Sequence, residues 1–125
     1  MPPPAAPNGH IVYEVNVEVD AVLADDYRAW MDVHVREMVA LPGFIGARIH
    51  NLLAPAPDAG LQAMCVLFYL RDAAALDAYL REHAQRFRAS STARFGNRFR
   101  TTRRVMRHTV TMDSEPLPAP HDPHY

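Results

Sequence analysis

The sequence predicts a single α+β domain with the element order β-α-β-β-α-β. Two observations lead to this prediction: strand-like apolar patterns in four segments, and helical spacing of apolar residues in two segments between them. A near-repeat links the two halves, because residues 29–34 (AWMDVH) and 78–83 (AYLREH) fall in equivalent helices. With 125 residues, 49% of them hydrophobic, the chain suits one core and leaves no room for a second.

The first strand and the first helix have the clearest patterns. Residues 11–19 alternate almost without exception, which predicts a strand with one apolar and one polar face. The apolar face carries Tyr13, Val15, Val17 and Val19, and the polar face carries Glu14, Asn16 and Glu18. Helical spacing starts after Asp20, a candidate N-cap, and stops at Pro42 and Gly43. The helix stripe contains Leu23, Tyr27, Trp30, Met31, His34, Met38 and Leu41.

The second and third strands enclose a proline-rich loop at residues 54–60. We expect the second strand at residues 44–53, with two distinct faces. One face carries Ile45, Ala47, Ile49 and Leu53, and the other carries Phe44, Arg48 and His50. The third strand, residues 61–70, is apolar on both faces, so we expect it in the middle of the sheet.

The second helix and the last strand complete the pattern. Asp72 can cap the helix, and an arginine-rich segment follows to about residue 98. The helix stripe contains Leu76, Tyr79, Leu80, His83 and Phe87. Residues 101–112 are β-branched and alternating, which predicts the fourth strand.

These elements assemble into a ferredoxin-like βαββαβ fold, with a four-stranded antiparallel sheet and both helices on one face. We expect the domain at residues 10–112, between a disordered proline-rich tail at residues 1–9 and a Pro- and His-rich tail at residues 113–125. The other sheet face has no helix to cover it. A mixed apolar and polar face of this size is typical of a subunit interface, so a homodimer is expected.

Composition limits the classes of function. The formal net charge is -1, yet acids crowd the first third and residues 86–107 hold eight arginines and no acid. These patches could attract each other between subunits, whereas the small net charge gives no field for nucleic acid. Cys65 is the only cysteine, which excludes an internal disulfide and favours a reduced, cytoplasmic protein. No stretch is long and apolar enough to indicate a membrane span.

Several segments resemble the DUF4286 family. They are residues 11–15 (IVYEV), the run from Trp30 and His34 to residues 41–44 (LPGF), and residues 80–83 (LREH) through 94–96 (RFG). This family is similar to a branch of the dimeric α+β barrel superfamily, which includes antibiotic-biosynthesis-monooxygenase-like proteins. The resemblance implies a homodimer with its sheets face to face and a cleft between helices and sheet in each subunit. It implies no particular reaction, because cofactor-free monooxygenases, haem-degrading enzymes and proteins without known catalysis share the superfamily.

The two histidines on the helix stripes are the candidate catalytic residues. If His34 and His83 face one cleft, an imidazole of near-neutral pKa could move a proton or orient a small aromatic or acidic ligand. The expected ligand-binding side chains of this cleft are Tyr13, Tyr27, Trp30, Tyr69, Tyr79 and Phe87. An enzyme of this kind would use cofactor-independent monooxygenase-like or proton-transfer chemistry.

Two other interpretations remain open. The rings could simply fill the core of a non-catalytic dimerisation or protein-interaction module, with each imidazole bonded to backbone or tyrosine. A metal held by His34 and His83 is disfavoured, because two imidazoles are too few and no carboxylate is expected on the inward stripe. We therefore expect neither a metal nor a cofactor.

Overall fold

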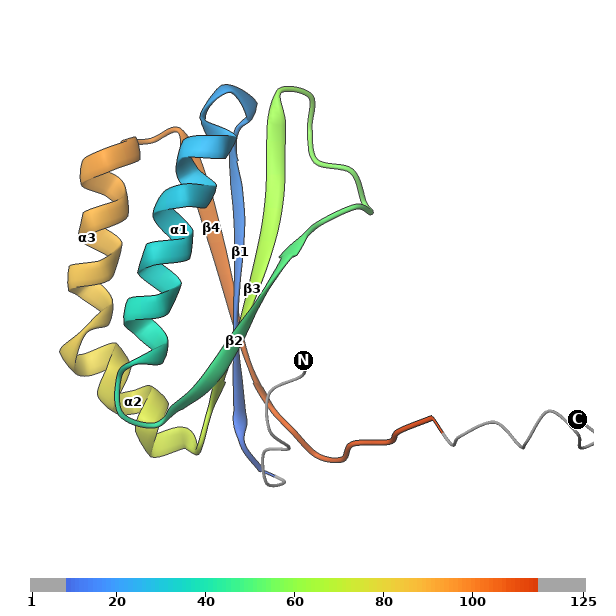
Figure 1. Cartoon of the computed structure of the whole chain (residues 1–125), viewed down its shortest axis with the longest axis vertical. Coiled ribbons are helices and arrows are strands. Elements are labelled where there is room, and N and C mark those ends of the chain that lie inside the picture. Colours follow the sequence, from blue (N-terminus) through green and yellow to red (C-terminus); the bar gives the residue numbers. More distant parts are fainter. Residues whose placement is uncertain (1–8, 115–125) are drawn as a thin grey trace, which may run out of the picture.

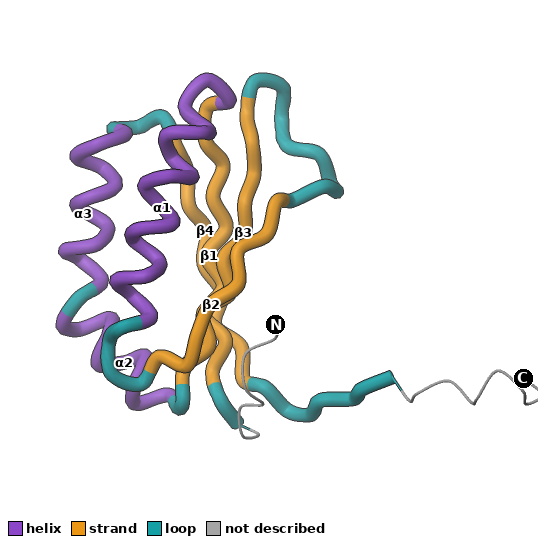
Figure 2. The backbone as a smooth tube through the Cα atoms, viewed as in Figure 1, coloured by secondary structure: helices purple, strands orange, loops and turns teal. Residues whose placement is uncertain are grey.

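A computed structural model of the chain describes residues 9–114 as a four-stranded antiparallel sheet with all helices on one face (Figures 1 and 2). The elements in chain order are β1 Ile11–Asp20, the 3-10 turn η1 Ala21–Leu23, α1 Ala24–Val39, β2 Phe44–Asn51, β3 Leu61–Leu70, α2 Ala73–Glu82, α3 Ala84–Phe95 and β4 Phe99–Arg107. The strand order is β2-β3-β1-β4, as in a ferredoxin-like fold, so the predicted fold class is confirmed. The predicted tails lie almost entirely outside the described residues.

β1 lies in the middle of the sheet, and its successive side chains lie alternately on the two faces of the sheet. It pairs with β3 on one side and with β4 on the other, both antiparallel. Its Tyr13, Val17 and Val19 are buried against the helices, as the alternation predicts. β3 is the other interior strand, and its double apolar character reflects that position. The largest fully buried side chains are Phe68, Met38, Leu70, Val19 and Val66.

Only one of the two predicted N-caps is correct. Asp72 Oδ1 accepts a hydrogen bond of 2.8 Å from the backbone N–H of Ala75 at the start of α2. Asp20 makes no such bond, because η1 separates it from α1. Its carboxylate instead accepts a bond of 2.6 Å from Arg98 Nε.

The predicted faces of the second strand are partly wrong. A register shift between Phe44 and Gly46 marks a bulge in β2. The extra residue reverses the alternation before it, so Phe44 packs against the core together with Ala47 and Ile49, and Ile45 does not. The strand also ends at Asn51, so it does not include Leu53.

The second predicted helix is two helices. α2 ends at Glu82 and α3 begins at Ala84, with His83 between them at φ −129° and ψ −31°, outside the helical region. Because the helix axis changes direction at this break, the apolar side chains of α2 and those of α3 need not lie on one continuous face. β4 starts two residues earlier than predicted and ends at Arg107.

Several of the opposite charges pair within the chain. Arg104 donates two bonds to Glu14, of 2.6 and 3.0 Å, directly across the β1–β4 ladder. Arg100 pairs with Glu18 at 3.2 Å in the same way. The Arg104 hydrogen bond is the largest influence on Glu14 and lowers the pKa of this buried carboxyl.

Substituting glycine at the α1–β2 turn tests this packing. Gly43 has φ +85°, and an added Cβ would lie 2.4 Å from the Cβ of Ala75. Gly60 has φ +82°, but its Cβ would meet nothing within 4 Å. We expect Gly60→Ala to lower the free energy of unfolding by about 1 kcal/mol, from backbone strain alone. Gly43→Ala should lower the free energy of unfolding by roughly 2 kcal/mol more than Gly60→Ala does, because of the steric clash with Ala75. Equal losses in urea unfolding would contradict the close approach of Gly43 to α2.

Candidate functional site

A pocket lies between the helices and the sheet, as the sequence predicts for the candidate site. Its walls come from β1, β3, β4 and all three α-helices. Six of the eight predicted site residues line it: Tyr13, Tyr27, Trp30, His34, Tyr79 and Phe87. The cavity volume is about 50 Å³, room for a few water molecules at most. Most of the space between helices and sheet is therefore filled by side chains.

His34 is part of the aromatic wall. Its ring stacks on Trp30, one helical turn earlier on α1, with centroids 4.6 Å apart and planes at 14°. The edge of Phe87 meets it from α3 at 4.8 Å. Burial lowers the pKa of His34 from 6.5 to about 4, so the imidazole is neutral at pH 7. Within residues 9–114, its ring nitrogens make no hydrogen bond.

This pKa differs from the near-neutral value that proton transfer would favour. No charged group offsets the desolvation of His34, because the predicted inward stripe brings no carboxylate beside it. A neutral imidazole offers one donor and one acceptor nitrogen, whereas a base with a pKa near 4 takes up protons weakly at pH 7. The ring is therefore better suited to hydrogen bonding than to general-base catalysis.

The buried tyrosines are also held in their neutral form. Burial is the main cause that raises the pKa of Tyr27 and of Tyr79 to about 12. The Tyr79 hydroxyl contacts Met38 Sδ at 3.8 Å, and the Tyr13 hydroxyl accepts a bond of 3.3 Å from Arg88 Nη2. Tyr27 and Tyr79 therefore keep their phenolic protons at neutral pH, and Tyr79 donates its proton to Met38 Sδ.

Two arginines at the pocket were not predicted as site residues. Arg88 on α3 and Arg103 on β4 are the exposed members of the lining, so the pocket opens between these two elements. The signal for Arg103 is its register: it lies opposite Val15, on the face of β4 toward the helices, where an apolar residue would be expected.

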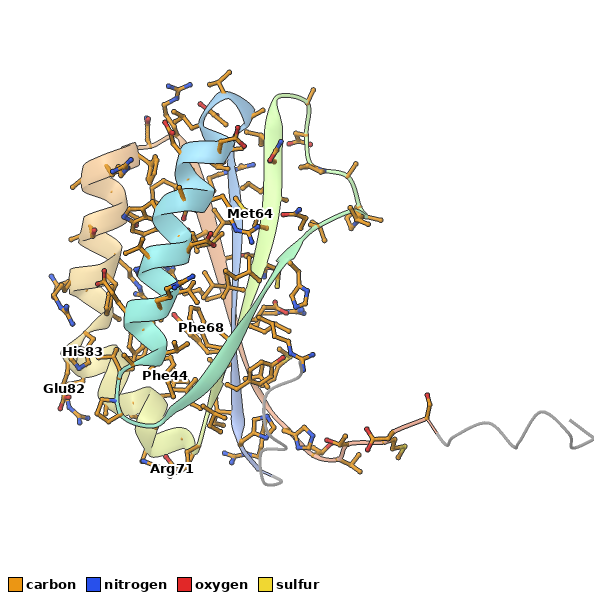
Figure 3. The ribbon with its side chains drawn as sticks, viewed as in Figure 1. Phe44, Met64, Phe68, Arg71, Glu82 and His83 are labelled. Carbon is orange, nitrogen blue, oxygen red and sulfur yellow. The ribbon has the colours of Figure 1, made fainter. Side chains whose placement is uncertain are left out.

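His83 does not share the pocket with His34, so this part of the prediction is wrong. The helix break leaves it at the α2–α3 junction, away from Phe68 on the sheet (Figure 3). Its Nδ1 lies 2.8 Å from Arg86 Nη2, and its Nε2 lies 3.9 Å from Glu82. The sequence near-repeat therefore does not correspond to a pair of facing histidines.

Tyr69 also lies outside the pocket. Its neighbours Phe68 and Leu70 are buried against the helices, and strand alternation turns Tyr69 to the open face of the sheet. There its ring lies 6.0 Å from that of His10, and the Arg48 guanidinium lies 5.9 Å above it.

The described part of the chain contains no cluster of three or more His, Cys, Asp or Glu residues able to hold a metal ion. Among its helices, none has the length and apolar character needed to cross a membrane.

Acid titration tests the environment of His34. Its pKa is lower in the folded chain than in the unfolded chain, so its contribution to stability is complete above pH 6.5 and is lost as the pH falls toward 4. Between pH 7 and pH 4.5, the free energy of unfolding of wild type should fall by on the order of 2 kcal/mol more than that of His34→Phe, as measured by urea unfolding. His83→Phe serves as the control outside the pocket and should follow wild type. Parallel losses in wild type and His34→Phe would show that the ring is solvated.

Comparison with known proteins agrees with this fold. A solved structure described as a dimeric ferredoxin-like protein, from an uncultured marine organism, has a TM-score of 0.56 and 12% identity to this chain. The match covers 84% of this chain and 99% of the other. At such low identity the likeness shows the fold alone.

No match is found among curated proteins. A family model described as Domain of unknown function (DUF4286) matches residues 10–109. This match covers most of the chain and agrees with the resemblance noted in the sequence. The protein therefore belongs to the DUF4286 family.

Proposed function

We propose that the protein is a homodimer of the dimeric α+β barrel type that binds a small aromatic or acidic molecule in the pocket between helices and sheet. The observation that carries this proposal is the neutral imidazole of His34, which lines the pocket without a hydrogen-bond partner within residues 9–114. Neither ring nitrogen of His34 is fully buried, so water or a polar group of a ligand can supply the missing hydrogen bond.

The aromatic lining suits a planar ligand. The aromatic wall consists of the Trp30 and His34 rings, which are stacked on each other, and of Phe87, whose ring lies at a steep angle to that of His34. Aromatic pairs of this geometry add to the stabilisation from buried area. A ring beside this wall could hydrogen-bond His34 or a protonated tyrosine through a polar substituent.

The size of the cavity limits the ligand. Typical small-molecule pockets hold roughly 300 Å³ or more, whereas this one holds about 50 Å³. The pocket must therefore widen to accept even one ring. Met31 and Met38 in its lining are unbranched side chains of a type that can repack, and Arg88 and Arg103 lie exposed at the opening. We propose a ligand with a single ring.

We propose binding as the primary role of the pocket and place catalysis second. Proton transfer favours a group whose pKa lies near the operating pH, and the pKa of about 4 makes His34 a weak base at pH 7. His83, the second candidate, lies outside the pocket.

The small cavity also favours the second candidate function, a non-catalytic dimer with a filled core. Such a dimer would form through the open sheet face, which carries Leu67, Tyr69 and the partly exposed Met106. Glu14 on this face is already paired with Arg104, so a partner would meet a face whose central charge is neutralised. The solved structure that shares this fold is described as dimeric, which supports a dimer without indicating the face used.

Ligand binding can be followed through Trp30, the only tryptophan of the chain. We expect single-ring phenols and aromatic acids to change its fluorescence and to raise the melting temperature, because they would contact the Trp30–His34 wall. His34→Gln should weaken binding about tenfold, from the loss of one hydrogen bond in a buried site. His50→Gln, on the exposed part of β2, is the control and should bind as wild type. No response from a varied panel would favour the filled core.

The dimer interface can be tested with a charge on the open face. We expect wild type to sediment with twice the mass of one chain and Leu67→Arg to sediment as a monomer, since an unpaired charge would be buried between the sheets. Val33→Arg, on the exposed side of α1, is the matched control and should remain dimeric. A wild-type monomer, or a dimeric Leu67→Arg, would argue against this interface.

A further inference from the structure

We infer that the ligand of the pocket is a carboxylate with a single aromatic ring, and that Arg88 and Arg103 bind its carboxylate at the pocket opening. This inference rests on the proposed function, because it specifies the ligand of the same site. It starts from the charges in the lining. Arg88 and Arg103 are the charged side chains there, and no Asp or Glu among residues 9–114 lines the pocket.

The arginines nearby have different partners. On the open face, Arg100 and Arg104 each pair with an acid of β1, and Arg98 pairs with Asp20 before the helix. Arg103 belongs to the same strand but faces the helices, and within residues 9–114 it makes no ion pair. On the open face, Arg100 and Arg104 lie opposite Glu18 and Glu14 of β1. On the other face, Arg103 lies opposite Val15 and therefore has no carboxylate across from it.

Arg88 has only a weak internal partner. Its Nη2 donates to the Tyr13 hydroxyl at 3.3 Å, which is long for such a bond, and it too makes no ion pair within residues 9–114. Arg88 on α3 and Arg103 on β4 both line the pocket beside the buried Tyr79. Together with Arg86 they lower the pKa of Tyr79, against the larger effect of burial. Positive charge from two elements therefore converges on one pocket.

A carboxylate fits this arrangement better than a neutral group. Guanidiniums bind carboxylates through short, charge-assisted hydrogen bonds that are about twice as strong as neutral ones. An anion would also relieve the repulsion between two like charges at the opening. Its ring would enter the aromatic interior, where Trp30 and Phe87 form the walls. The carboxylate of the ligand would thus stay near water at the opening, and its apolar ring would be buried among the aromatic side chains.

The test compares two isosteric probes, 4-hydroxybenzoate and 4-hydroxybenzamide, which differ in charge and not in size. Binding is measured from Trp30 fluorescence. We expect wild type to bind the acid at least tenfold more tightly than the amide. Arg103→Gln and Arg88→Gln should each weaken acid binding about tenfold and leave amide binding unchanged. Raising the salt concentration should weaken binding of the acid alone.

Arg94→Gln provides the matched control, because Arg94 is an exposed arginine of α3 that does not line the pocket. It should bind both probes as wild type. Equal affinity for acid and amide, unchanged by Arg103→Gln, would overturn the carboxylate inference and leave the proposed ligand site intact. Failure of both probes to change the fluorescence of Trp30 would overturn the inference and the proposed function together.

Discussion

The alternation of β1 is the constraint on which the rest of the structure depends. The strand lies between β3 and β4, so each of its side chains has neighbours on both sides. Its apolar face forms the floor of the pocket through Tyr13, Val15 and Val17. Its polar face carries Glu14 and Glu18, which neutralise arginines of β4. A shift of register by one residue would exchange these faces and bury the carboxylates beneath the helices.

This division of charge explains the character of the pocket. Glu14 and Glu18 of β1 pair with arginines on the open face and Asp20 pairs with Arg98, so none of these acids pairs with Arg103. None of them lines the pocket beside His34. The same pattern therefore gives a neutral histidine with a pKa near 4 and an arginine without an ion pair. On the open face, paired charges and apolar side chains lie together. Such a surface can be covered by a second chain without leaving a buried charge unpaired.

Much of the fold could be predicted from the sequence, because the patterns of β1, β3 and α1 are regular. The misplaced residues have specific causes. Nothing at His83 signals a helix break, since neither glycine nor proline lies there, and its stripe was extended across the break. Tyr69 was assigned to the wrong face because β3 is apolar on both faces, so its sequence pattern does not indicate which side chains face the helices. Arg103 was missed because a run of arginines conceals which of them alternation turns inward. Local patterns identify elements, whereas pairing and breaks decide which side chains meet.

The most direct measurement of this account is a crystal structure of the full chain grown with 4-hydroxybenzoate at neutral pH. We expect two copies packed through their open sheet faces. In each copy we expect a bound ring beside Trp30 and His34, with its carboxylate on Arg88 and Arg103. Side chains that alone fill the space between helices and sheet, with no ligand bound, would contradict the claim that this pocket is a ligand site. A monomer would contradict the proposed dimer.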